Sequence, residues 1–402
     1  MFDCKVAYYV NDNIQHFPPV HRLQTKLPGP IIVRGQHIFD YIQKQYPDIA
    51  KRVFFIRDRG KAKAFLKKHQ IRVVVYPMFK TLSFGLSVEI FHGGLSDKRY
   101  LENAFISVYD LVLFPGEKSR DKVAKAELLE NVVDYEVVGY PKFDPLINDA
   151  LEYQPLFTNG KPTVLYAPTW ISMAKEGATG HRFSLYGESS LPLWGINLLK
   201  HMPESVNFIV KFHSLVHEDG NSVNKQMEDY VKQHGLEHRI KILYADNILQ
   251  YMDQADVMIS DISSACYEWF HFNRPIIYAN PDPVHYRESD DISSNTFAWQ
   301  AGDVINTEED IATLIKRNLN ADAHQEMRNK IFHYSIYQPD GHATERQADA
   351  IVKLLGKYES VPYKQFVRNC ALKHFRRNLK MNLFLKRKVD KLEGLDGLPK
   401  HG

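Results

Sequence analysis

The chain has 402 residues, more than one domain usually holds, so its length predicts two domains. With 44% hydrophobic and 25% charged residues it can form full apolar cores. No stretch approaches about eighteen consecutive apolar residues, and the first residues lack a basic region followed by an apolar run. We therefore expect neither a membrane-spanning helix nor a secretory signal. The three cysteines, Cys4, Cys266 and Cys370, are far apart, which fits a reducing cytoplasm and supports neither a disulfide framework nor a metal cluster.

Short apolar runs alternate with polar, helix-compatible stretches through the first part of the chain. The runs that predict strands are KVAYYV, PIIVRG, RVFFIR, RVVVYP, SVEIFHGG, LVLFPG and YEVVGYP. Stretches such as HIFDYIQKQYPDIAKR and GKAKAFLKKHQ lie between them and predict helices. This alternation is typical of a parallel sheet with helices on both faces.

The stretch DPLINDALEYQPLFTNGKP, residues 144–162, interrupts this pattern. A second alternating set follows, with TVLYAPTW, NFIVKFHS, RIKILYA, DVMISD and PIIYAN as its predicted strands. We expect an α/β protein of two tandem Rossmann-like domains facing a cleft, with ligands beyond the carboxyl ends of the strands. The predicted boundaries are 1–152 for the first domain, 153–360 for the second and 361–402 for a basic helical tail.

The tail, residues 361–402, is the most basic part of the chain. It holds eleven Lys or Arg against three Asp or Glu, a net charge of +8, so the rest of the chain sums to +3 minus +8, or −5. Apolar residues are spaced among these cations: Phe366, Leu372, Phe375, Leu379 and Leu383. A basic amphipathic helix of this kind suits an anionic membrane surface. A helix packed on the body or a disordered basic end would have the same composition.

Unusual polar residues recur where the predicted strands end. Because these positions come from both predicted sheets, their side chains could converge on one cleft. A histidine titrates near neutral pH and suits a general base, although a lone histidine is more often structural. The positions are His92 with Gly93 and Gly94 beside it, Lys142, Pro168 and Thr169, Lys211 and His213, and Ser260 and Asp261.

The turn SDISS, residues 260–264, lies between a predicted strand and a predicted helix. A helix start offers unpaired backbone N–H groups and the positive end of the helix dipole, which suit a phosphate. Ser263 and Ser264 would also be ordinary capping residues without any ligand. Glu268, one turn into the helix, either accepts hydrogen bonds from a ribose or polyol hydroxyl or is a solvated carboxylate. The stretch DGHATER predicts a second helix start, either another phosphate site or a plain surface turn.

Several familiar nucleotide and metal motifs are missing from the sequence. It contains no GxxxxGK[ST], GxGxxG, HExxH, paired CxxC or nucleophile elbow. It also lacks an Asp-x-Asp of the kind that holds a metal–nucleotide complex. No cofactor is required by the sequence, and a divalent metal is neither demanded nor ruled out.

Six segments together resemble the CDP-glycerol glycerophosphotransferase family, the teichoic-acid primases and polymerases. They run in the family's order from about residue 90 to 350: FHGG, VVGYPKFDPL, VLYAPTW, VKFH, ADVMISDISSACYEWFHFNRPIIY and DGHATER. The resemblance implies a glycosyltransferase-B-like fold, with a CDP-alcohol donor bound mainly by the second domain and an acceptor served by the first. Residues before 90 resemble the family more weakly.

The resemblance also implies roles for single residues. Gly94, Ser214 and Glu268 depart from the family's usual Thr, Pro and Asp, which leaves the identity of the alcohol open. The implied catalytic residues are His92, on the acceptor side, and His213. The implied donor-binding residues are Gly93, Gly94, Lys142, Pro168, Thr169, Lys211, Phe212, Ser263, Ser264 and Glu268.

We therefore expect transfer of a polyol phosphate, most of all glycerol phosphate, from a CDP-alcohol to a hydroxyl of a membrane-linked or polymer acceptor. CMP would be released, in teichoic-acid-like or capsule polymer synthesis. The expected partners are CDP-glycerol or CDP-ribitol, a lipid-linked or polymer acceptor and an anionic membrane surface, without nucleic acid. The expected location is cytoplasmic, peripheral on the inner face of the plasma membrane. The alternatives are a nucleotide-sugar glycosyltransferase or epimerase of the same fold, and a non-catalytic scaffold of envelope polymer assembly.

Overall fold

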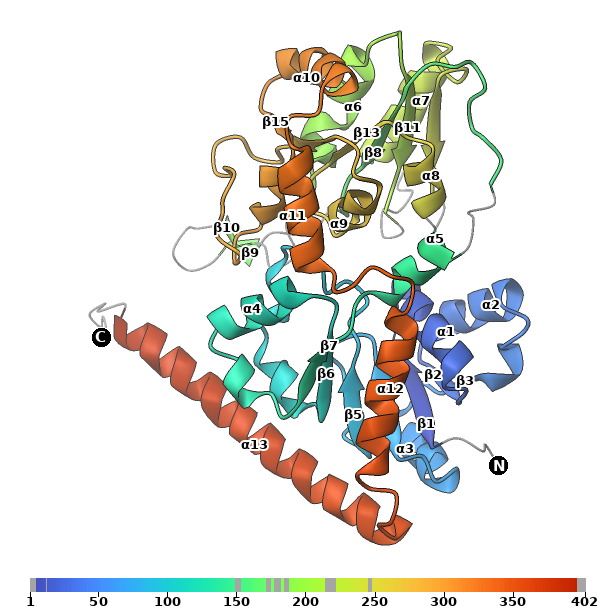
Figure 1. Ribbon diagram of the computed structural model, residues 1–402, viewed down its shortest axis with the longest axis vertical. Coiled ribbons are helices and arrows are strands. Elements are labelled where there is room, and N and C mark those ends of the chain that lie inside the picture. The colour runs from blue at the N-terminus through green and yellow to red at the C-terminus, as the bar shows by residue number, and fades with distance from the viewer. Residues whose placement is uncertain are drawn as a thin grey trace. The chain divides into compact units, whose positions relative to one another are not determined.

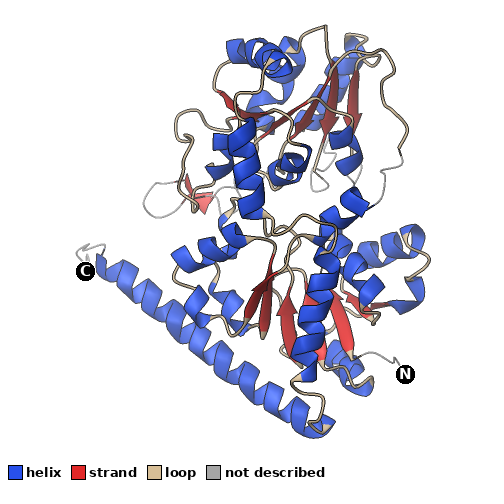
Figure 2. Ribbon diagram, viewed as in Figure 1, coloured by secondary structure: helices blue, strands red, loops and turns tan. Residues whose placement is uncertain are grey.

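The chain divides into two compact units, drawn in Figure 1 and, by secondary structure, in Figure 2. Unit 1 comprises Met1–His92, Leu101–Asn148 and Tyr337–Gly402, and unit 2 comprises Gly93–Tyr100 and Asp149–Ile336. The computed structural model describes residues 5–11, 13–148, 153–170, 175–176, 182–183, 188–213, 222–244 and 248–395.

Unit 1 is built on a parallel sheet of seven strands in the order β3-β2-β1-β4-β5-β6-β7. Val and Ile dominate its central strands, which are buried on both faces, as expected where helices cover a parallel sheet. The winding direction reverses between β1 and β4, which makes this the switch point of the sheet. The strands are β1 (Val6–Val10), β2 (Ile31–Val33), β3 (Val53–Phe55), β4 (Val73–Tyr76), β5 (Leu86–Glu89), β6 (Leu111–Phe114) and β7 (Tyr135–Val137).

The helices of unit 1 come from both ends of the chain. α12 packs against α1, and its apolar residues Ala348, Ile351 and Leu354 belong to the same core as Val6 and Tyr8 of β1. The helices are α1 (Phe17–Lys26), α2 (Gln36–Gln45), α3 (Arg59–Lys68), α4 (Glu117–Lys125), α5 (Asp144–Asn148), α12 (Ala343–Gly356) and α13 (Tyr363–Leu395). Short 3₁₀ turns connect several of them, among them η1 (Ile14–His16), η4 (Ala104–Val108), η5 (Leu129–Asn131) and η6 (Pro141–Phe143).

Unit 2 has a parallel sheet of six strands in the order β12-β11-β8-β13-β14-β15, with its switch point between β8 and β13. The strands are β8 (Thr163–Ala167), β11 (Asn207–Lys211), β12 (Ile240–Leu243), β13 (Val257–Ser260), β14 (Ile276–Ala279) and β15 (Asp303–Ile305), with a separate antiparallel pair, β9 (Lys175–Glu176) and β10 (Arg182–Phe183). The helices are α6 (Leu191–His201), α7 (Val223–Gln233), α8 (Leu249–Asp253), α9 (Ala265–Trp269), α10 (Glu308–Asn320) and α11 (Gln325–Ser335), and η8 (Phe297–Ala301) is a 3₁₀ turn.

Two parallel sheets with helices confirm the predicted α/β fold of two Rossmann-like halves, but the units do not follow the predicted boundaries. Residues 337–360, which we expected in the second domain, cluster with unit 1 because α12 completes its core. Residues 93–100, which we expected in the first domain, cluster with unit 2.

Within the predicted tail, Tyr363–Leu395 form one continuous helix, α13, which clusters with unit 1. One face is buried, at Phe366, Cys370, His374 and Met381. Arg72 holds the segment before it by donating to the carbonyls of Tyr358 at 2.9 Å and Val361 at 2.7 Å. His374 Nε2 donates to Gly85 O at 2.8 Å, and Lys373 and Arg377 pair with the buried Asp110. The helix is therefore packed on the body at this face, while its outward face carries exposed Leu and Phe side chains.

Candidate active site

His92 lies at the end of a sharp turn after β5. Phe91, the residue before it, has φ of +50°, a left-handed conformation that is costly for a bulky side chain. Glu89 Oε1 stabilises the turn by accepting a hydrogen bond from the Phe91 backbone N–H at 3.0 Å. Burial raises the pKa of Glu89 well above its usual value. The strained turn and its internal carboxyl group direct the chain so that His92 leaves the sheet.

The carbonyl of Pro77, just after β4, holds His92 by two hydrogen bonds. The backbone N–H of His92 and its ring Nδ1 each lie 2.9 Å from Pro77 O. Because a carbonyl can only accept, Nδ1 carries the proton, which places the lone pair of the neutral ring on Nε2. Tyr140 adds a third anchor, since its hydroxyl donates to His92 O at 3.1 Å. The neighbouring Lys142 is half-buried in η6 of the same unit.

His16, which we did not predict, lies beside His92. It belongs to η1, after β1, and the two ring centroids are 4.3 Å apart with the planes inclined by 66°. Burial, with His92 and Lys80 nearby, lowers the pKa of His16 to about 2, so its ring is neutral at any ordinary pH. His16 and Pro77 follow β1 and β4, on the two sides of the switch point in unit 1. His16 lies six residues beyond the end of β1 at Val10, so the strand-end rule that selected His92 did not reach it.

In unit 2, Asp261 joins the segments that follow β8 and β13. Its carboxylate accepts hydrogen bonds from Thr169 N at 2.9 and 3.1 Å and from both N and Oγ of Ser190 at 2.8 Å. Burial raises the pKa of Asp261 to about 6, although these hydrogen bonds and Lys98 act in the opposite direction. Asp261 is therefore a structural organiser at the switch point of unit 2, and it holds the Pro168–Thr169 turn in place.

Lys98 supplies a cation next to Thr169 that the sequence did not reveal to us. Its Nζ donates to Thr169 Oγ1 at 2.7 Å, and desolvation lowers the pKa of Lys98 to about 8. Asp97 fixes this segment to unit 2, because its carboxylate accepts from Tyr267 Oη at 2.5 Å and from Ala298 N at 2.9 Å. The segment begins with Gly93 and Gly94, both buried, and a Cβ at Gly93 would lie 3.3 Å from Tyr100 Oη.

The other predicted donor residues of unit 2 lie at the ends of β11 and β13. Lys211 is 6% exposed at the last position of β11, and Phe212 is fully buried in the hydrophobic core, where its ring lies 5.3 Å from that of Tyr244. Phe212 is thus a core residue. His213, directly after it, is partly exposed.

The predicted helix start at Ser263 and Ser264 exists, but α9 has only five residues, so its dipole is small. Ser263 Oγ accepts from Ala265 N at 3.3 Å and therefore acts as a local cap, whereas Ser264 makes no side-chain cap bond. Glu268 is 4% exposed. The alternative in which Glu268 is a solvated helix carboxylate is therefore wrong.

The helix start in DGHATER is already occupied by a side chain of unit 1. Asp144 accepts hydrogen bonds from Ala343 N at 3.1 Å and from Thr344 N at 2.7 Å, and from the Thr344 hydroxyl at 2.5 Å. The first N–H groups of α12 are therefore satisfied by a carboxylate, and the possibility that they bind a second phosphate is not supported. Among the described residues, no three His, Cys, Asp or Glu side chains gather as a metal site would require.

These features define a two-sheet α/β protein with the buried His16 beside the half-buried His92 in one half and a lysine beside a strand-end threonine in the other. The family model described as CDP-Glycerol:Poly(glycerophosphate) glycerophosphotransferase matches residues 83–353, about two thirds of the chain. The chain belongs to this family of transferases.

One curated relative is the teichoic acid poly(ribitol-phosphate) polymerase of Bacillus spizizenii, 25% identical over 232 residues. The match covers 56% of this chain and 34% of the relative, so it spans about a third of the polymerase's length.

Two solved structures show the same fold. A variant of the wall teichoic acid polymerase TagF soaked with CDPG aligns over 89% of this chain and 90% of its own, with a TM-score of 0.56 and 16% identity. The S. aureus MnaA–UDP co-structure aligns over 89% and 98%, with a TM-score of 0.55 and 12% identity.

Proposed function

We propose that this protein transfers a polyol phosphate, most of all glycerol phosphate, from a CDP-alcohol to a hydroxyl of a membrane-linked or polymer acceptor. The observation that carries this proposal is the anchoring of His92, because the Nδ1 hydrogen bond to Pro77 O at 2.9 Å prepares Nε2 as a base. Family membership supports the reaction class. Because one relative is a poly(ribitol-phosphate) polymerase, ribitol phosphate is the second candidate for the transferred group.

In the proposed reaction the acceptor hydroxyl attacks the β-phosphorus of the CDP-alcohol. His92 Nε2 takes the hydroxyl proton as the new O–P bond forms. The bond from the β-phosphorus to the bridging oxygen breaks, and CMP leaves with the bonding electrons. Phosphoryl transfer of this kind depends mainly on positioning and on charge stabilisation.

The donor diphosphate is assigned to unit 2. Lys98, Lys211 and His213 supply donors there, and Ser263 and Ser264 add hydroxyl and backbone N–H groups. Lys98 and Thr169 form a preorganised pair, because Asp97 fixes the lysine and Asp261 fixes the threonine. Removing one such donor typically lowers the rate by about 10²–10³-fold.

We also propose that α13 lies on an anionic membrane surface. Its outward face carries four large apolar side chains, Leu372, Phe375, Leu379 and Leu383, each between 50% and 68% exposed. Their spacing of three or four residues places them in one row, opposite the buried row that begins at Phe366. The net charge of +8 in residues 361–402 complements anionic lipid. Among the described residues, no helix has the length and apolarity needed to cross a bilayer.

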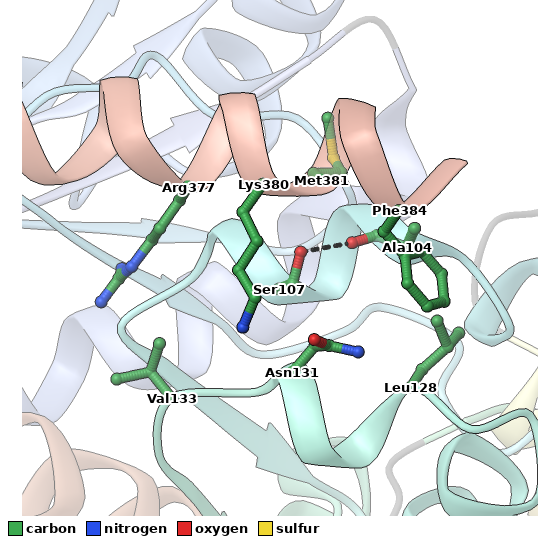
Figure 3. Close-up of a pocket in the computed structure, with 9 residues that line it drawn as sticks. All are labelled: Ala104, Ser107, Leu128, Asn131, Val133, Arg377, Lys380, Met381 and Phe384. Atoms are coloured by element: carbon green, nitrogen blue, oxygen red, sulfur yellow. Dashed lines mark hydrogen bonds between the residues drawn. The ribbon is translucent and has the colours of Figure 1, made fainter. Parts of the chain in front are cut away.

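A cavity of about 200 Å³ beside α13 offers a place for a lipid phosphate (Figure 3). Arg377 and Lys380 project from the helix to the same side, towards Asn131 and Val133, and Met381 and Leu128 contribute apolar walls. Because Arg377 is already paired with Asp110, we assign the binding of a phosphate in this cavity to Lys380.

The reaction is tested by measuring CMP release from CDP-glycerol, CDP-ribitol and a panel of UDP- and CMP-sugars, with bacterial membranes as the acceptor source. We expect release from a CDP-alcohol, and loss of that release in His92→Ala while CDP-glycerol binding by calorimetry persists. Turnover of a nucleotide sugar alone would favour a glycosyltransferase or epimerase. CDP-alcohol binding without turnover on any acceptor would favour a scaffold.

A further inference from the structure

The hydrogen bond from the His92 ring to Pro77 O does not by itself fix the plane of the ring. A bond at Nδ1 fixes the position of one nitrogen, but the imidazole can still tilt about the line from Nδ1 to the carbonyl oxygen. A base must hold its lone pair within about 10–20° of the productive direction. A contact on the face or edge of the His92 ring restricts this tilt, and unit 1 supplies one in His16, whose ring centroid is 4.3 Å away.

His16 lies on a rigid part of unit 1. Asn13 caps the turn by accepting from Gln15 N at 3.0 Å, and His16 N donates to Asn13 O at 3.1 Å. Phe17 follows at once and packs edge-on against Tyr46 at 4.9 Å. The His16 ring is 4% exposed, so it has little room to move.

A histidine at this position is expensive for stability. Its Nδ1 is buried and makes no hydrogen bond with any described residue. An unpaired buried nitrogen costs about 1–3 kcal/mol, which an apolar ring of similar size would avoid. The imidazole is thus a poor choice if its only task is to fill space next to His92.

We infer that His16 is a positioning residue: its ring sets the plane of the His92 imidazole and faces the imidazolium that His92 becomes on taking the acceptor proton. A neutral ring offers π-electron density to a neighbouring cation, whereas a charged one would repel it. The low pKa of His16 keeps its ring neutral, so the proton taken from the acceptor stays on His92. This inference rests on the proposed role of His92 as the base.

The test compares His16→Phe and His16→Ala with the wild-type chain. We expect kcat to fall about 10-fold in the Phe variant, which keeps a ring but loses the polarity, and about 100-fold or more in the Ala variant, which frees the His92 ring. The KM for CDP-glycerol and its affinity by calorimetry should stay within twofold of wild type in both, which also shows that unit 2 is folded. The melting temperature should be equal or higher in the Phe variant and lower in the Ala variant.

The expected order of activity, His above Phe above Ala, therefore differs from the expected order of stability. Full kcat in the Phe variant, or kcat that simply follows the melting temperature, would overturn the inference and make His16 a packing residue. If His92→Ala itself keeps its turnover, the proposed function of His92 fails first. Inactive His92→Ala together with fully active His16 variants would reject the role of His16 alone.

Discussion

Lys98, in the proposed donor site, changes its charge within the range of pH in which enzymes are assayed. Its pKa is lowered to about 8 by desolvation, so the ammonium form dominates below pH 8 and is lost as the pH rises through that value. A diphosphate needs the charged form. We predict that the KM for CDP-glycerol rises above pH 8 in the wild-type chain, and that Lys98→Met raises it about 10–100-fold at pH 7.

Lys98→Arg is the matched control, because a guanidinium keeps its charge throughout this range. Its KM should lack the rise above pH 8 even if its value at pH 7 differs from wild type. Initial rates from pH 6.5 to 9.5 measure both effects. Identical pH profiles for the wild type and the Arg variant would remove Lys98 from the donor site.

Among single residues, the sequence predicted His92, Thr169 and the Ser263–Ser264 turn as site candidates, because each of them follows an apolar strand closely. It did not predict Lys98 or His16. Lys98 lies in a segment without a strand, and only Asp97 and its contacts in unit 2 bring it to Thr169. His16 becomes notable only through its ring contact with a residue 76 positions further along the chain. Such meetings depend on tertiary structure and leave no local signal in the sequence.

Among the elements, the start of α12 shows how a side chain takes the place of a ligand. Asp144 satisfies two backbone N–H groups and a hydroxyl there. We predict that Asp144→Ala lowers the free energy of unfolding of unit 1 by about 1–3 kcal/mol, because buried donors lose their acceptor. A urea titration followed by circular dichroism measures this change, and tryptophan fluorescence, which comes from unit 2 alone, serves as the reference.

Asp340→Ala, in the same turn, is the comparison for Asp144→Ala. Asp340 pairs with Arg346 and its side chain is 45% exposed, so its loss should cost well under about 1 kcal/mol. Neither variant should alter the affinity for CDP-glycerol. A weakened affinity in Asp144→Ala at unchanged stability would instead mean that the start of α12 belongs to the donor site.

Most strands were predictable because buried parallel strands read as continuous Val- and Ile-rich runs, as in β4 and β13. β15 was missed because its three residues, Asp303–Ile305, include a polar end and lie at the sheet edge. The placement of α12 was also missed. Its sequence shows an apolar face but does not say which of two similar sheets that face will cover.

For the whole molecule, the packing of α13 changes how membrane attachment should be tested. Deleting residues 361–402 would uncover the apolar surface that Phe366 covers and would remove both cations paired with the buried Asp110, so we expect it to destabilise unit 1. We predict instead that replacing Leu372, Phe375, Leu379 and Leu383 by Gln abolishes binding to anionic vesicles while stability changes little. Co-sedimentation at low and high salt measures binding, which should weaken as salt screens the basic residues.

Val284→Gln is the control for the α13 variant, because Val284 is 75% exposed in unit 2 and should not affect pelleting. With neutral vesicles, little of either the wild type or the fourfold variant should co-sediment. Equal pelleting of the wild type and the fourfold variant would reject the membrane surface. A change from dimer to monomer in the fourfold variant would show that the outward face of α13 binds a second copy of the chain.

Unit 1 combines segments that lie before and after unit 2 in the sequence, and this arrangement affects folding during synthesis. Its core joins Val6 and Tyr8 to Ile351, Leu354 and Phe366, residues that leave the ribosome after all the strands of both units. Unit 2, made mainly of the middle of the chain, has its sheet residues available earlier. While unit 2 is being synthesised, the seven strands of unit 1 therefore lack the helices α12 and α13 that later pack on them. During this interval their apolar surface is exposed and can bind chaperones.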